Sequence, residues 1–93
     1  MKKYEVMYII RPELDEEAKK GLIAEINAAF EAHASVVEKV TEWGIRDLAY
    51  EINKCRKGYY VLLNVNATVE AVNEFNRLAN IKENVIRHIV VAE

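Results

Sequence analysis

The stretch WGIRDLAYEINKCRKGYYVLLNV, residues 43–65, decides the fold of this chain. Polar and apolar side chains alternate in its first part, a polar run ending in glycine follows, and a continuous apolar run extends from Tyr59 to Val65. Two such runs joined by a short polar segment predict the antiparallel strands of a β-hairpin. The alternation extends back to Ser35, which makes the first strand long, and Gly44 predicts a bulge or kink within it.

An amphipathic helix is expected on either side of this hairpin. Asp15 can accept hydrogen bonds from the free backbone N–H groups at the start of the first helix, and Thr68 can do so for the second. Apolar residues then recur at spacings of three and four, which gives each helix one apolar stripe that has to lie on a sheet. The first stripe comprises Ala18, Leu22, Ile26, Ala29, Phe30 and His33, and the second comprises Ala71, Phe75, Leu78 and Ala79.

Two further strands complete the pattern, because residues 3–10 and 85–92 also alternate and give the order β-α-β-β-α-β. Right-handed crossovers then place both helices on the same face of a four-stranded antiparallel sheet. The predicted fold is therefore the α+β ferredoxin-like two-layer sandwich. Because 93 residues are too few for two hydrophobic cores, we expect residues 1–93 to form a single domain.

The composition excludes several classes of protein. Hydrophobic residues make up 52% of the chain and charged residues 30%, as in globular proteins and unlike disordered segments. No segment approaches the roughly 20 apolar residues of a membrane span, so we expect a cytoplasmic protein without membrane contact. The net charge of −2 argues against a strongly basic coat for nucleic acid. Acidic residues nevertheless crowd in the first helix while basic ones fall in strands and their connections, which predicts an acidic and a basic side.

The sequence lacks residues with the spacing of a catalytic or metal site. It has no glycine-rich phosphate loop and no Cys-x-x-Cys pair, since Cys55 is the single cysteine, and His33 and His88 lack a second ligand at metal spacing. We therefore expect no enzyme, no cofactor, no metal and no small-molecule substrate. The alternative is a small enzyme whose acid, base and nucleophile meet only on folding.

Three motifs together resemble one protein family. They are Lys-x-Tyr-Glu-Val in Lys2–Val6, Gly-x-Arg-x-Leu-Ala-Tyr-x-Ile in Gly44–Ile52, and Asn-x-Ile-Arg-x-x-Val-Val in Asn84–Val91. With these motifs the chain resembles bacterial small-ribosomal-subunit protein six from end to end. The resemblance implies a component of the small ribosomal subunit that pairs with small-subunit ribosomal protein eighteen. It also implies that the pair binds the central domain of small-subunit (16S) ribosomal RNA and contributes to subunit assembly and translation. Many members have two adjacent basic residues where this chain has Arg46 followed by Asp47.

The expected binding residues follow from what these two partners need. Phosphate groups are bound by lysine and arginine on a rigid surface, and we expect rRNA contacts from Lys2, Lys3, Arg46, Lys54, Arg56, Lys57, Arg87 and His88. The third strand is apolar in both phases and needs a protein cover, so we expect partner contacts from Trp43, Ile45, Tyr60 and Leu62. The plainer interpretation of each charged residue is a solvated side chain that keeps the protein soluble.

A rival function is that of an RNA-recognition motif, which has the same order of elements and binds single-stranded RNA. Lys57-Gly58-Tyr59-Tyr60-Val61 partly matches the motif on its third strand. In that motif a small residue follows the first aromatic, whereas Tyr60 occupies this position here, and the first strand lacks a matching motif. Stacking of single-stranded bases is therefore the weaker of the two mechanisms.

Overall fold

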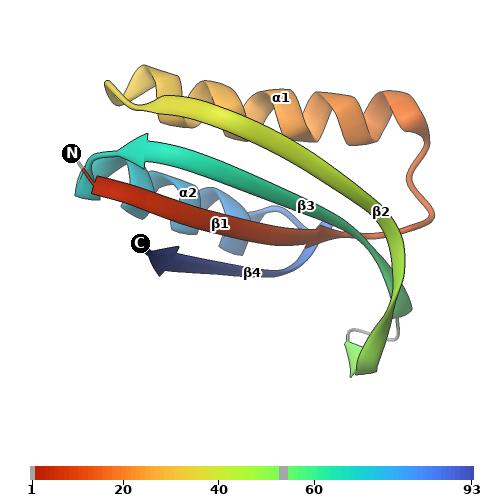
Figure 1. Cartoon of the computed structure of the whole chain (residues 1–93). Coiled ribbons are helices and arrows are strands. Elements are labelled where there is room, and N and C mark those ends of the chain that lie inside the picture. Colours follow the sequence, from red (N-terminus) through yellow and green to blue (C-terminus); the bar gives the residue numbers. More distant parts are fainter. Residues whose placement is uncertain (1, 53–54) are drawn as a thin grey trace.

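The computed structural model describes residues 2–52 and 55–93, which form four strands and two helices in the predicted order (Figure 1). The elements are β1 (Lys2–Ile10), α1 (Glu16–Ala32), β2 (Val36–Ile52), β3 (Cys55–Ala67), α2 (Val69–Ile81) and β4 (Val85–Ala92). All neighbouring strands are antiparallel, and their order across the sheet is β2-β3-β1-β4. The predicted ferredoxin-like sandwich is confirmed. Neither helix in these two ranges is long and apolar enough to cross a membrane.

The start of each helix is fixed by the predicted capping residue. The backbone N–H of Ala18 donates to Oδ1 of Asp15 over 2.7 Å, and that of Ala71 donates to the hydroxyl of Thr68 over 3.1 Å. Both bonds satisfy donors that a helix leaves without an internal partner. Helix α1 ends at His33, and the next residue, Ala34, has a left-handed backbone with φ 58°.

The hydrophobic core lies between the helices and one face of the sheet. Register pairs Tyr8 of β1 with Val61 of β3, so both side chains point to the same, helix-covered side. Phe75 of α2 lies at the centre, because its ring is stacked on Phe30 of α1 at 5.6 Å and lies 6.1 Å from the ring of Tyr8. The largest fully buried side chains are Val6, Tyr8, Ile10, Ile26, Phe30, Val61, Leu63, Val65 and Phe75.

The prediction that Ala18 belongs to the apolar stripe of α1 is wrong. Ala18 is exposed, whereas Lys19 is buried, with its ammonium group 4.6 Å from the ring centroid of Tyr59 on β3. A lysine can bury its hydrocarbon chain when its ammonium group makes a cation–π contact with an aromatic ring. The spacing of residues along the helix could not predict this, because Tyr59 is distant in the sequence.

Strand β2 contains the bulge predicted at Gly44 and a second one that was not predicted. The register with β3 shifts between Glu42 and Gly44, where Gly44 has φ 83°, and also between Val37 and Lys39. In a regular strand Trp43 and Ile45, two residues apart, would lie on the same face, but the bulge separates them. The bulge leaves Trp43 stacked on Tyr60 but pairs Ile45 with Tyr59, whose ring lies on the helix-covered side.

The polar run at 55–58, expected to be a turn, belongs to strand β3. Arg46 and Asp47 of β2 pair with Gly58 and Lys57, so the two strands continue as a ribbon beyond the last β1 pair, Ile10 with Tyr59 (Figure 1). We call residues 46–52 and 55–58 the hairpin arm. The polar side chains of Arg56 and Lys57 are compatible with a strand because both are exposed.

Candidate functional site

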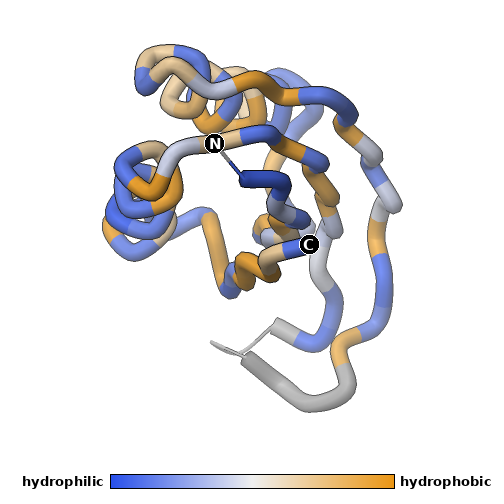
Figure 2. Tube along the Cα trace, turned by 60° about the vertical axis from the view of Figure 1, so that its left-hand side comes forward, coloured by the Kyte–Doolittle hydropathy of each residue, from blue (hydrophilic) through white to orange (hydrophobic). Residues whose placement is uncertain are grey.

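The sheet face opposite the helices, here called the open face, is the candidate site. Figure 2 shows α1 and α2 on the same side of the strands, so no described element covers the other face of the sheet. Alternation along β1 and β4 places Met7 and Ile9 on this face, opposite Ile89 and Arg87. Apolar residues on an uncovered sheet face favour binding of a protein partner.

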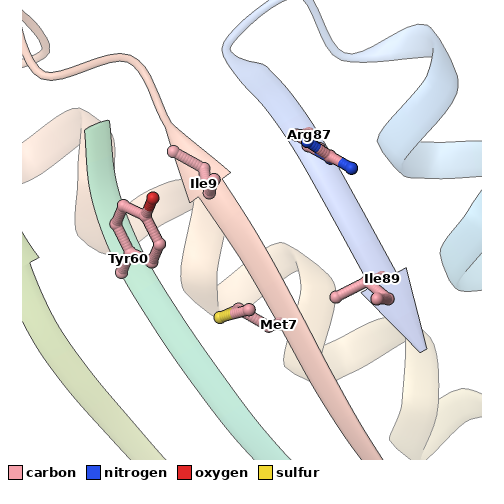
Figure 3. A pocket seen from close by; sticks show the side chains of 5 residues that line it. All are labelled: Met7, Ile9, Tyr60, Arg87 and Ile89. Carbon is pink, nitrogen blue, oxygen red and sulfur yellow. The ribbon is translucent and has the colours of Figure 1, made fainter. Parts of the chain in front are cut away.

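A hollow lies near the centre of the open face. It is lined by Met7 and Ile9 of β1, Tyr60 of β3, and Arg87 and Ile89 of β4, and has a volume of about 200 Å³ (Figure 3). Ile9 is only 7% exposed and forms its floor, whereas Ile89 is 48% exposed at the β4 edge. The lining is apolar apart from the guanidinium of Arg87 and the hydroxyl of Tyr60.

An aromatic stack borders the hollow on the β2 side. The rings of Trp43 and Tyr60 are nearly parallel, at 11°, with centroids 6.3 Å apart. The guanidinium carbon of Arg46 lies 5.9 Å from the centroid of Trp43. Trp43 stays 45% exposed, so the stack is a rigid apolar surface that water still reaches.

Two of the three arginines expected to bind RNA, Arg46 and Arg87, lie at opposite ends of an apolar strip. This strip is formed by Trp43, Tyr60, Ile9 and Ile89. Arg46 is on the first strand of the sheet, pairing with Gly58, and Arg87 is on the last, pairing with Ile9. Neighbouring strands are about 4.8 Å apart, and three such spacings lie between the first strand and the last. The two backbones are therefore separated by roughly 14 Å across the sheet. Both side chains are exposed at the margin of the open face.

The other predicted basic residues are spread more widely. Lys3 shares the alternation of Met7 and lies on the open face, whereas Lys2 is in the opposite phase. Arg56 and Lys57 are exposed on the hairpin arm. Lys54, also expected to bind RNA, lies outside the described residues.

His88 is not brought together with its sequence neighbour Arg87. Its ring packs edge-on against Phe75 on the helix-covered side, at a centroid distance of 5.6 Å. Burial there lowers the pKa of His88 below its ordinary value of 6.5, so the ring is neutral at pH 7. Of the four expected partner residues, Trp43, Tyr60 and Leu62 lie on the open face, and Ile45 does not.

A polar cluster on the helix-covered side, not predicted from the sequence, holds the base of the hairpin arm. The hydroxyl of Tyr59 donates to Oε1 of Glu42 over 2.6 Å, and this bond, followed by burial, raises the pKa of Tyr59 to about 12. The ammonium of Lys19 lies over the same ring. The cluster therefore links α1, β2 and β3 at the point where the arm leaves the sheet.

The described part of the chain contains no group of three or more histidine, cysteine, aspartate or glutamate side chains placed to hold a metal ion. What the open face offers chemically is an apolar centre between guanidinium groups. Such a surface suits recognition of other macromolecules, with area burial at the centre and charge pairing at the margin.

Comparisons with known protein families and with solved structures agree. The family model described as ribosomal protein S6 matches residues 3–92. Among solved structures, the crystal structure of 30S ribosomal protein S6 from Thermotoga maritima at 1.70 Å resolution is similar, with a TM-score of 0.93 and 26% sequence identity. The alignment covers 99% of this chain and 87% of that chain.

Proposed function

Since the chain belongs to the ribosomal protein S6 family and is a protein of the small ribosomal subunit, we propose that it binds the central domain of small-subunit ribosomal RNA together with ribosomal protein eighteen. In this role it contributes to subunit assembly in the cytoplasm as one 93-residue domain. It acts by presenting a preformed surface and carries out no reaction.

The open face is the observation that supports this proposal. Its apolar centre, around Ile9 and Tyr60, suits a protein, whereas Lys3, Arg46 and Arg87 at its margin suit the phosphates of RNA. A partner that covers the centre also brings its own charges to the same edge, so protein and RNA stabilise each other's binding. The acidic residues Glu17 and Glu31 of α1 are exposed on the far side of the sheet, away from the RNA.

Recognition of single-stranded RNA by base stacking is the less favoured function. An RNA-recognition motif stacks bases on aromatic residues of its first and third strands. Here Tyr60 is on the open face of β3, but both tyrosines of β1, Tyr4 and Tyr8, belong to the helix-facing alternation. Among the described residues of β1, the open face therefore offers Met7 and Ile9 in place of an aromatic platform.

The proposal is tested by titrating a central-domain rRNA fragment with the protein across a salt series, with and without purified ribosomal protein eighteen. We expect tight, salt-sensitive binding only when both proteins are present. Arg46→Ala and Lys3→Ala should each weaken it and reduce the salt slope by about one unit, as expected for one lost phosphate contact.

Lys20→Ala is the matched control, because Lys20 is an exposed cation on α1, on the other side of the sheet. It should leave affinity and salt slope unchanged. Absence of binding with both folded proteins present, or an equal loss in the control, would refute the proposed interface. Tight binding to short unstructured RNA without the partner would instead support the single-strand function.

A further inference from the structure

We propose that the hollow receives one bulky apolar side chain of the protein partner, and that a carboxylate beside that side chain pairs with Arg87. This inference rests on the proposed function, in which a protein covers the open face, and it names the contact that anchors that protein. The geometry of the hollow carries it (Figure 3).

The size of the hollow fits a single side chain. Its volume of about 200 Å³ is below the roughly 300–1,000 Å³ typical of pockets for small molecules and cofactors. Its floor, Ile9, packs closely over Gly58 of the neighbouring strand β3, since even a methyl group on that glycine would lie 2.2 Å from Ile9 Cγ2. The hollow is therefore preformed, which reduces the entropic cost of filling it.

The lining favours an apolar protein side chain over a nucleobase. Met7, Ile9 and Ile89 contribute aliphatic surface, whereas a base has several polar atoms along its edge that lose water on entry. Only Arg87 and the Tyr60 hydroxyl offer polar groups in this lining, too few to replace that water. The ring of Tyr60 already stacks on Trp43.

Charge complementarity points to the neighbouring carboxylate. Arg87 lies at the rim of the hollow, and a guanidinium can hold a carboxylate through two parallel hydrogen bonds. Interfaces concentrate binding energy in a buried apolar anchor surrounded by such polar contacts. An apolar side chain would fill the apolar interior of the hollow, and a neighbouring aspartate or glutamate would pair with Arg87 at its rim.

The experiment measures the affinity for ribosomal protein eighteen by calorimetry, for the wild type and for Ile89→Ala, Arg87→Ala and Arg87→Glu. Val91→Ala is the matched control, because Val91 is 52% exposed on the same strand and face, outside the hollow. We expect Ile89→Ala to weaken binding roughly tenfold or more, and Val91→Ala less than about threefold.

The carboxylate is identified by charge reversal. Arg87→Glu should weaken binding more than Arg87→Ala, and changing one aspartate or glutamate of the partner to lysine should restore it. Equal effects of Ile89→Ala and Val91→Ala, or no effect of either, would overturn the anchor while leaving the partnership intact. If the wild type itself does not bind the partner, the proposed function fails first. Loss of RNA binding with unchanged protein pairing would place a nucleobase in the hollow and also overturn the proposal.

Discussion

Replacing Gly58 by alanine is expected to destabilise the protein through a single contact. Gly58 lies on β3 beside Ile9, the floor of the hollow, and its φ is outside the left-handed region, so backbone strain plays no part. A Cβ at this position would lie 2.2 Å from Cγ2 of Ile9 and 3.5 Å from Cδ2 of Leu48. The first distance is shorter by about 1.3 Å than the closest comfortable carbon–carbon contact of roughly 3.5 Å.

The magnitude follows from two opposing effects. Forcing a methyl group into a packed site costs about 1–3 kcal/mol, and Ile9 cannot easily turn away because its β-branched side chain is stiff. Replacing glycine by alanine also restricts the unfolded chain, which returns about 0.4–1 kcal/mol. The free energy of unfolding should therefore fall by about 1–2 kcal/mol. With an unfolding entropy of roughly 0.2 kcal/mol/K for 93 residues, the melting temperature should drop by roughly 5–10 °C.

Thermal and urea unfolding followed by circular dichroism measure both quantities. Two backgrounds isolate the contact: Ile9→Leu removes the Cγ2 methyl and keeps the size, whereas Ile9→Val keeps that methyl. Gly58→Ala should cost little in the Ile9→Leu background and its full amount in the Ile9→Val background. Equal costs in both, or a Gly58→Ala protein as stable as the wild type, would refute the reasoning.

Three further predictions concern stability. Phe75→Ala removes the ring that packs against Phe30 and Tyr8. Urea titrations should show the free energy of unfolding lowered by about 3–5 kcal/mol. A loss below about 1 kcal/mol would contradict this and mean that neighbouring side chains fill the cavity. Ala34→Gly places a residue without a Cβ in the left-handed conformation after α1 and should raise the free energy of unfolding by about 0.5–1 kcal/mol. The urea midpoint should rise accordingly, and an unchanged midpoint would contradict this prediction. Because burial lowers the pKa of His88, its protonation favours the unfolded chain. The stabilising contribution of the neutral His88 ring should thus be complete above a pH of about 6.5 and be lost as the pH falls through the folded-state pKa. His88→Gln should make this loss shallower, and identical pH profiles would contradict a half-buried neutral ring.

Local signals in the sequence were sufficient to predict the elements and their order. Asp15 and Thr68 cap the helices as expected because a cap depends on residues only three positions apart. The alternation of β4 gave its bounds, residues 85–92, without change. The topology then followed from the handedness of crossovers, which holds for almost any sequence.

The parts that were not predicted depend on contacts between distant residues. The second bulge of β2, between Val37 and Lys39, has no glycine to mark it, and each bulge reverses the faces of the residues beyond it. Burial of Lys19 depends on Tyr59, forty residues away. The surplus apolar residues of the open face were recognised, but the hollow requires the exact pairing of three strands, which alternation alone does not supply.

The place of β1 in the sheet has a consequence for the protein's own synthesis. Of the six described elements β1 is translated before the others, yet one of its two neighbours, β4, is translated after all of them. While the nascent chain lacks β4, one long edge of β1, with the apolar residues Val6, Tyr8 and Ile10, has no strand to pair with. Such an unpaired strand edge is prone to pair with other chains. A ribosome that translates this future ribosomal component thus has to make residues 85–92 before the central strand can pair on both sides.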